Sequence, residues 1–248
     1  MRYHVKPEAY GEALHEVYDH MYPGEDTLGA IEFLASLAGP EGRVVEFGAG
    51  TGRLAIPLAE RGLEVYAIEA SPSMLDNLHE RDAGNKVKTV CADFAEHVVG
   101  DGFDLCYIAC NTLFMVVDSE RQIEVLRRAA EHLKPGGRLV VEVYDPTPIH
   151  RFDKPNVQIR HLTPDRVMID HMDVDQLEQL LVQVHTVIGN GSVSTYTELS
   201  RYAFPRELDL MARLAGLDKE ARYGDWRGGP FGHGSRQHVT VYRSQAQA

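Results

Sequence analysis

The feature that most constrains the fold of this 248-residue chain is a short segment that almost lacks side chains. VVEF at 44–47 is an apolar run interrupted by one acid, and GAGTG at 48–52 follows it directly. RLAIPLAERG at 53–62 then has the composition of a helix. Glycine allows positive φ angles and lets another molecule approach the backbone closely. The order of strand, glycine-rich turn and helix predicts a ligand-binding turn at the end of a buried strand.

Strands and helices go on alternating after this turn. The strands read as continuous apolar runs, which is typical of parallel strands buried on both faces. Short links between alternating strands and helices indicate right-handed crossovers, with helices covering both faces of one sheet. The predicted strands lie at 64–71, 87–94, 103–110 and 138–144, and the predicted helices at 8–22, 27–39, 71–81 and 119–137.

The pattern changes after Pro148, where four segments rich in β-branched residues replace the alternation. Gly189-Asn190-Gly191 is a turn signal between two of them and predicts a small antiparallel sheet. A helix at 205–217 and a closing strand pair follow. We therefore predict an α/β fold: a Rossmann-like, doubly wound mixed sheet of seven strands, the last antiparallel, with an inserted small antiparallel β lid. The predicted units are an N-terminal helical cap (1–40), the core (41–148), the lid (149–204) and the closing helix and strands (205–248).

Composition limits the partners and the compartment. There are 25 basic and 37 acidic residues, so the net charge of −12 disfavours nucleic acid as the main partner. No apolar run has membrane-spanning length and the N-terminus has no secretory signal pattern, so we expect a cytoplasmic protein with no membrane partner. Three cysteines without CxxC spacing indicate thiols in a reducing compartment. Twelve histidines without an HExxH motif lead us to expect no metal site.

Two acids at strand ends add to the glycine turn. The spacing GxGxG departs from the dinucleotide pattern GxGxxG, and a glycine loop alone is compatible with an ordinary strand–helix turn. Glu69 ends the second strand, where a carboxylate can accept hydrogen bonds from ribose hydroxyls. Asp93 ends the third strand, where a carboxylate can accept from the amine of adenine or cap a turn.

These motifs together resemble the class I S-adenosylmethionine-dependent methyltransferases. VVEFGAGTGRLAIPLAERG, the acid followed by ASPSML, then ADF and LKPGGRLVVE carry the resemblance over 43–144, and HVTVYR at 238–243 resembles the antiparallel seventh strand of that family. The resemblance implies S-adenosylmethionine as the cofactor, with the loop around its methionine part, Glu69 on the ribose and Asp93 on the adenine. The cofactor-binding positions it implies are Tyr18, Glu46, Gly48, Ala49, Gly50, Thr51, Gly52, Glu69, Ala70, Met74, Ala92, Asp93, Phe94, Cys110 and Asn111.

The chemistry of this cofactor supports the resemblance. It carries an ammonium, a carboxylate and a sulfonium but no phosphate, whereas a dinucleotide brings a pyrophosphate to the loop. An acid at Glu46, beside the loop, suits an ammonium and opposes a pyrophosphate. Two alternatives stay open: an NAD-dependent oxidoreductase of Rossmann type, and a non-catalytic protein that binds the same cofactor as a regulator. Methyl transfer has no obligatory catalytic residue that would separate enzyme from regulator.

The acceptor is expected to be a small molecule. RYAFPRELDLMARLAGL at 201–217, with the closing strand, resembles natural-product methyltransferases, including sugar N-methyltransferases of antibiotic pathways. CNTL at 110–113 lacks the two prolines that base-methylating enzymes carry after their fourth strand. The predicted function is transfer of a methyl group to N or O of the acceptor by in-line displacement, with orientation supplied by the protein and water excluded by the lid.

Candidates for acceptor contact come from the N-terminal cap, the lid and a late loop, DWRGGPFGHGS at 225–235. The candidate catalytic bases are His171, His233 and Tyr22; the candidate substrate-binding residues are Tyr22, Arg160, His171, Arg201 and Trp226, with Gln183 and His185 on the same predicted polar sheet face. Each has a simpler interpretation: a solvated charge on an exposed sheet face, a solvated loop histidine, or aromatic packing. The sequence leaves the identity of the acceptor and the formation of a homo-oligomer undetermined.

Overall fold

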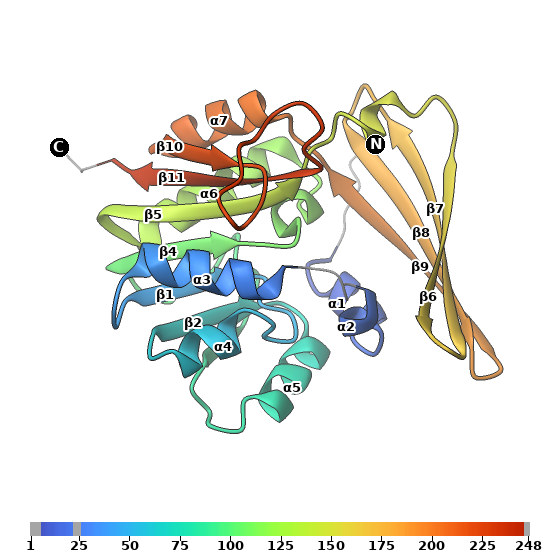
Figure 1. Cartoon of the computed structure of the whole chain (residues 1–248), viewed down its shortest axis with the longest axis horizontal. Coiled ribbons are helices and arrows are strands. Elements are labelled where there is room, and N and C mark those ends of the chain that lie inside the picture. Colours follow the sequence, from blue (N-terminus) through green and yellow to red (C-terminus); the bar gives the residue numbers. More distant parts are fainter. Residues whose placement is uncertain (1–5, 22–25, 246–248) are drawn as a thin grey trace.

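Two separate β-sheets organise the chain (Figure 1). The structure is a computed structural model that describes residues 6–21 and 26–245. A seven-stranded mixed sheet forms the core, and a four-stranded antiparallel sheet stands beside it. The predicted architecture, a Rossmann-like core with an inserted antiparallel lid, is therefore confirmed.

The core sheet has the strand order β10-β11-β5-β4-β1-β2-β3. Five strands run parallel, β11 is antiparallel to β5, and β10 is antiparallel to β11. The strand order along the sheet reverses between β1 and β4. In such a sheet, ligands bind at the carboxyl ends of the strands beside this point. The strands are β1 (Arg43–Phe47), β2 (Glu64–Glu69), β3 (Lys88–Cys91), β4 (Phe103–Ile108), β5 (Leu133–Tyr144), β10 (Leu217–Tyr223) and β11 (Gln237–Ser244).

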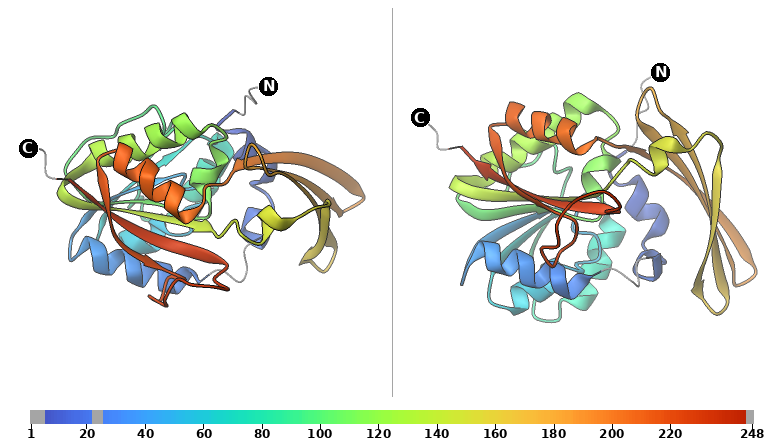
Figure 2. Two further views of the ribbon diagram at one scale, coloured as in Figure 1. Left: turned by 90° about the horizontal axis from the view of Figure 1, so that it is seen from above. Right: turned by 45° about the horizontal axis from the view of Figure 1, so that its top comes forward.

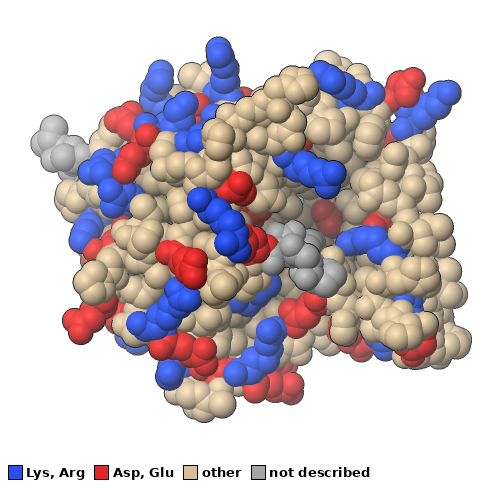
Figure 3. Space-filling view, viewed as in Figure 1, with Lys and Arg blue, Asp and Glu red and all other residues tan. Residues whose placement is uncertain are grey.

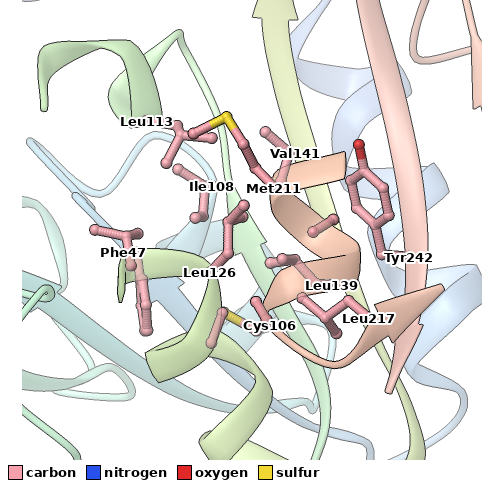
Figure 4. Packing of buried hydrophobic residues seen from close by; sticks show 14 of the residues in the cluster. Phe47, Cys106, Ile108, Leu113, Leu126, Leu139, Val141, Met211, Leu217 and Tyr242 are labelled. Carbon is pink, nitrogen blue, oxygen red and sulfur yellow. The ribbon is translucent and has the colours of Figure 1, made fainter. Parts of the chain in front are cut away.

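Helices cover both faces of the core sheet. On one face, α3 (Thr27–Ala38), α4 (Ala55–Glu60) and α5 (Pro72–Arg81) bury one hydrophobic cluster against the strands. On the other face, α6 (Ser119–His132) and α7 (Pro205–Leu214) bury a second cluster, in which Leu126 and Met211 meet strand residues such as Val141 (Figure 4). Burial of both faces accounts for the continuous apolar runs that predict these strands.

The lid is a meander of four long antiparallel strands. It consists of β6 (Asn156–Thr163), β7 (Arg166–Asp175), β8 (Leu180–Gly189) and β9 (Ser192–Arg201). The short helices α1 (Ala9–Leu14) and α2 (Tyr18–Met21) lie between the lid and the core (Figures 1 and 2). Leu14, Val17 and Met21 pack there against Met168 of the lid. The N-terminal segment thus joins the two sheets at the ligand-binding edge.

Three predicted boundaries differ from the structure. The single helix predicted at 8–22 is two short helices, and Tyr22 lies outside the described residues. The helix predicted at 119–137 ends at His132, because Leu133 is already extended and Pro135 disfavours a helical conformation for the residue before it. The third strand is only four residues long. Two 3-10 turns, η1 (Thr112–Met115) and η2 (Ile149–Arg151), complete the elements.

The charged side chains on the face shown in Figure 3 are of both signs and interspersed. Many are paired, for example Glu220 with Arg138 and Arg243. Exposed pairs of this kind contribute little to stability. No helix within the described ranges combines the length and the apolar character needed to cross a membrane.

Candidate cofactor and acceptor site

The glycine turn follows β1 at the carboxyl edge of the core sheet. Gly48, Gly50 and Gly52 all have positive φ angles, of 75°, 54° and 80°. A Cβ on Gly48 would stand 2.4 Å from Cγ2 of Thr112, so the turn lies directly against η1. A Cβ on Gly52 would stand 2.8 Å from side chains of α4 and α5. Two of the glycines are therefore needed for packing within the protein, and the backbone around Gly50 is the part that faces the N-terminal cap.

Glu69 at the end of β2 is tied to this turn. Its Oε2 accepts a hydrogen bond from the amide of Gly50 at 2.9 Å, and its Oε1 accepts one from the amide of Ser71 at 2.9 Å. Burial raises the pKa of the Glu69 carboxyl. Each oxygen of a carboxylate has two lone pairs, so both retain capacity for a further donor. Glu69 is thus both a brace for the glycine turn and an acceptor at the strand edge, next to Ala70.

Asp93 lies on the neighbouring strand tip. The amide of Ala92 donates to the carbonyl oxygen of Glu69 at 3.0 Å, which holds the two strand ends together. Oδ1 of Asp93 accepts from the amide of Ala95, and its Oδ2 pairs with Arg121 at 2.5 Å. Asp93 therefore has the turn-capping role that its position permits, together with an arginine partner.

Glu46 lies beneath the turn, between β1 and β4. Its side chain is 4 % exposed, and its Oε2 accepts a hydrogen bond from the hydroxyl of Tyr107 at 2.9 Å. Burial, opposed by that hydrogen bond, raises the pKa of Glu46 to about 8. Most of the carboxyl is then protonated at neutral pH, so the charge that the sequence assigned to it is largely absent. Glu46 supports the loop from below.

The end of β4 is a strained bend. Cys110 and Asn111 both have positive φ angles, of 53° and 62°, which are uncommon for residues other than glycine. Oε2 of Glu142 accepts from the amide of Cys110 at 2.6 Å, and Oδ1 of Asn111 accepts from the amide of Tyr144 at 2.7 Å. The neighbouring β5 thus holds this bend in place. Such strained backbone is often found at functional sites.

The N-terminal cap lies against the glycine turn. The ring of Tyr18 lies 3.8 Å from the position that a Cβ of Gly50 would occupy. Asp19 accepts hydrogen bonds from the hydroxyl of Thr51 at 2.9 Å and from Arg81 at 2.8 Å. The main contacts of the cap therefore reach both the loop and α5.

Three further positions from the predicted cofactor set are packing residues here. Ala49 belongs to the core cluster on the α3 face, and Met74 is 2 % exposed beneath α1. Phe94 stacks on Phe47 with ring centroids 5.6 Å apart. These contacts place all three around the strand tips but give each a structural partner.

The two faces of the lid carry different side chains, and the sequence analysis assigned residues of both faces to one polar face. Directly paired residues share a face, so Arg160, Met168, Asp170 and His185 all point inward, toward the N-terminal cap. His171 is exposed on the outer face, one position out of phase, so the structure does not bring it to the face that meets the N-terminal cap.

Arg201 also points away from the inner face. It pairs with Glu207 at 2.7 Å and donates to Gln122 at 3.0 Å, so it anchors the lid to α6 and α7. Arg160, by contrast, does lie on the inner face, where it donates to the carbonyl oxygen of Met21 at 3.2 Å and to Asp170 at 2.7 Å.

The loop between β10 and β11 contains the two remaining predicted contacts. Trp226 is 4 % exposed and packs edge-on against Phe33 of α3, with centroids 5.8 Å apart, so it is a core residue. The loop is also fixed by an ion pair between Arg227 and Asp26 at 2.7 Å. His233 is exposed in this loop. The prediction that Trp226 contacts substrate is therefore replaced by a packing role.

The inner lid face carries a group of polar side chains, several of which the sequence analysis did not single out. Asp170, Tyr196 and Glu198 surround His185, and Tyr10 of the cap lies edge-on to Tyr196 with centroids 6.2 Å apart. Strict alternation along 166–175, where Met168, Asp170 and Met172 share a face, would have identified Asp170. In the described part of the chain, no group of three or more metal-ligating side chains is placed to hold a metal ion.

Comparison with known proteins identifies the family. Residues 44–137 match a model described as a methyltransferase domain. A cypemycin N-terminal methyltransferase from Streptomyces is 31% identical, over 96% of this chain and 99% of that protein. The solved structure of the CcbJ methyltransferase from Streptomyces caelestis is 36% identical, covers 98% of this chain and 100% of that chain, and superposes with a TM-score of 0.91. A sugar N-methyltransferase, KedS8 from Streptoalloteichus, shares the fold at 18% identity with a TM-score of 0.69.

The match to the cypemycin enzyme extends over essentially both chains, and the glycine turn, Glu69 and Asp93 stand at one edge of the sheet. This relationship leaves no support for the NAD-dependent alternative. The chain belongs to the S-adenosylmethionine-dependent methyltransferases.

Proposed function

We propose that the chain transfers the methyl group of S-adenosylmethionine to an amine nitrogen of a small natural product, by in-line displacement. The observation that carries the proposal is the meeting of the glycine turn, Glu69 and Asp93 at one strand edge, under both the N-terminal cap and the lid. The similarity to an enzyme named for N-terminal methylation favours nitrogen over oxygen as the acceptor atom.

The residues present fit the methyl donor. Glu69 would hold the ribose hydroxyls, because both of its oxygens keep a lone pair beyond their amide partners. Asp93 would take the adenine amine, sharing its Oδ2 with Arg121 or exchanging it. The backbone of 48–52 and the ring of Tyr18 would enclose the methionine part. When bound, the donor supplies a methyl group that is already activated by the sulfonium.

The chain's own contribution is then orientation and exclusion of water. The cap lies against the strand edge with the lid beyond it, and the bend at Cys110 and Asn111 is held in one conformation by β5. Holding two reactants in line removes much of the entropic barrier to their reaction. A neutral amine already carries the lone pair that attacks, so it needs no base to activate it, in contrast to a hydroxyl acceptor.

The proposal is tested by incubating the protein with labelled S-adenosylmethionine and matched acceptors that differ only in amine versus hydroxyl. We expect label in the amines and a mass increase of one methyl group at nitrogen. Transfer to the hydroxyl members alone would contradict the choice of nitrogen. Tight donor binding with no transfer to either class would instead favour a non-catalytic regulator.

A further inference from the structure

The inner face of the lid carries a buried charged cluster that the cofactor site does not use. Nδ1 of His185 lies 2.6 Å from Oδ1 of Asp170, and Nε2 lies 3.0 Å from Oε2 of Glu198. Arg160 donates to the other oxygen of Asp170 at 2.7 Å. Burial lowers the pKa of His185, but the two carboxylate hydrogen bonds outweigh it and raise that pKa to about 9. At neutral pH His185 is therefore protonated and stands as a second cation of the cluster, beside Arg160.

Glu198 differs from Asp170 in one respect. Asp170 is 2 % exposed and both of its oxygens are bound to cations. Glu198 is 14 % exposed, and only its Oε2 is bound, since Oε1 accepts no hydrogen bond from any residue in the described ranges. The cluster thus presents one carboxylate oxygen at its edge, with capacity for further donors.

This oxygen belongs to the part of the lid that lies over the strand tips. β9 packs against η1, the turn that follows the bend at Cys110 and Asn111. Tyr144, at the end of β5, has a buried hydroxyl that lies beside Ser200 of β9. Burial raises the pKa of this hydroxyl, the side chain of Ser200 opposes the rise, and the charge of Glu198 adds to it, which puts Glu198 in the electrostatic surroundings of Tyr144.

A row of aromatic rings joins the same region to the glycine turn. Tyr196, two positions before Glu198 on the same face, stacks parallel to His185 with centroids 6.5 Å apart. Tyr10 lies between Tyr196 and Tyr18, with centroid distances of 6.2 and 6.3 Å. Since Tyr18 lies against the glycine turn, this row of rings leads from the glycine turn to the lid strand that carries Glu198.

We propose that the open oxygen of Glu198 binds the amine of the methyl acceptor, with His185 and Asp170 as positioning residues that fix the carboxylate. This inference rests on the proposed function. It assigns the acceptor class as an amine with at least one N–H group, which donates to Oε1.

The chemistry of the transfer suits a carboxylate at that position. The lone pair of the amine nitrogen forms the new bond to the methyl carbon, while the carbon–sulfur bond breaks and its electron pair stays on sulfur. Positive charge moves from sulfur to nitrogen, and the methylated ammonium loses its proton to solvent. A fixed negative group beside the nitrogen stabilises the charge that develops there.

The test compares Glu198→Gln, which keeps size and removes charge, with Glu178→Gln, which changes an exposed acid in the turn between β7 and β8. The probes are L-prolinamide, an alanine-terminated peptide amide and the methyl glycoside of an aminopentose, each with labelled S-adenosylmethionine. For the amine that the wild type methylates, we expect Glu198→Gln to lower kcat/KM roughly ten- to hundredfold. Glu198→Asp should restore part of the rate, and Glu178→Gln should equal the wild type.

Two companion measurements separate binding of the acceptor from stability of the lid. Cofactor affinity should be unchanged in Glu198→Gln, and the variant should stay folded at the assay temperature, with a melting temperature lowered only by the share of the His185 stabilisation that Glu198 supplies. A wild-type kcat/KM in this variant, a loss of rate that follows a loss of folding, or a wild type that binds the cofactor yet methylates none of the three amines would each overturn the assignment. A wild type that fails to bind S-adenosylmethionine would refute the proposed function itself, and the assignment with it.

Discussion

The charged cluster of the lid gives the fold a specific dependence on pH. His185 is 2 % exposed and has a pKa of about 9 against an ordinary value of 6.5. The difference between these two pKa values is equivalent to roughly 3 kcal/mol, and the low exposure of the side chain means that solvent screens little of it. Because the folded pKa is the higher one, this stabilisation is complete below about pH 6.5 and is lost as the pH rises through about 9.

The stability that Asp170 contributes changes with pH in the opposite direction. Burial tends to raise the pKa of Asp170, but its hydrogen bonds to His185 and Arg160 lower it below the ordinary value. The stability that this carboxylate contributes is present above the ordinary Asp pKa and is lost as the pH falls through the lowered one. Measurements at pH 6.5 and above therefore keep Asp170 ionised throughout, and comparison with a variant of His185 cancels the contribution of other groups, such as Glu46, that titrate in the same range.

The perturbation is His185→Gln, assayed by urea unfolding at pH 6.5 and pH 9.5 alongside the wild type. We expect the wild type to lose roughly 3 kcal/mol more unfolding free energy between the two pH values than the variant does. Hydrogen exchange should show the extra loss in β7 and β8, where Asp170 and His185 lie. Equal losses in the two proteins would refute a protonated His185 that is held by two carboxylates.

Two further substitutions test individual parts of the structure. Gly48→Ala should destabilise the protein by about 1–3 kcal/mol and weaken cofactor binding, because φ at Gly48 is 75° and the new Cβ would meet Thr112 at 2.4 Å. Thermal unfolding measures the stability and calorimetry measures the affinity. A melting temperature and an affinity equal to those of the wild type would contradict the close contact. Trp226→Ala should lower the free energy of unfolding in urea by about 3–5 kcal/mol, because the side chain is buried against Phe33. The KM for the acceptor should be unchanged in the folded fraction. A large increase in KM without loss of stability would show that Trp226 contacts the acceptor.

The core of the fold was predictable because its signals are local. Buried parallel strands give apolar runs, and the turn at 48–52 needs glycine at Gly48 and Gly52 for reasons that the structure makes explicit. The strand-end acids Glu69 and Asp93 follow from the same logic, since parallel strands end at one edge. These residues could be predicted because each lies at a fixed spacing along the chain from the end of a buried strand.

What the sequence did not reveal depends on contacts between distant segments. The mostly protonated state of Glu46 comes from burial beside Tyr107, 61 positions away. The role of Arg201 comes from α6 and α7, and the burial of Trp226 comes from α3.

The two faces of the lid were not separated in the sequence analysis for a different reason. Side chains on adjacent positions of a strand face opposite ways, so His171 and Asp170 cannot share a face. Applying that alternation to each lid strand separately would have placed Asp170, His185 and Glu198 together and His171 outside.

The central claim is that Glu69 and the glycine turn hold S-adenosylmethionine at the strand edge, and calorimetric titration tests it most directly. We predict one molecule bound per chain in the wild type and a loss of roughly 1–3 kcal/mol of binding free energy in Glu69→Gln, measured at a temperature where the variant is folded, since its amide group can accept from only one of Gly50 and Ser71. Absence of binding by the folded wild type, or an unchanged affinity in Glu69→Gln, would contradict the account.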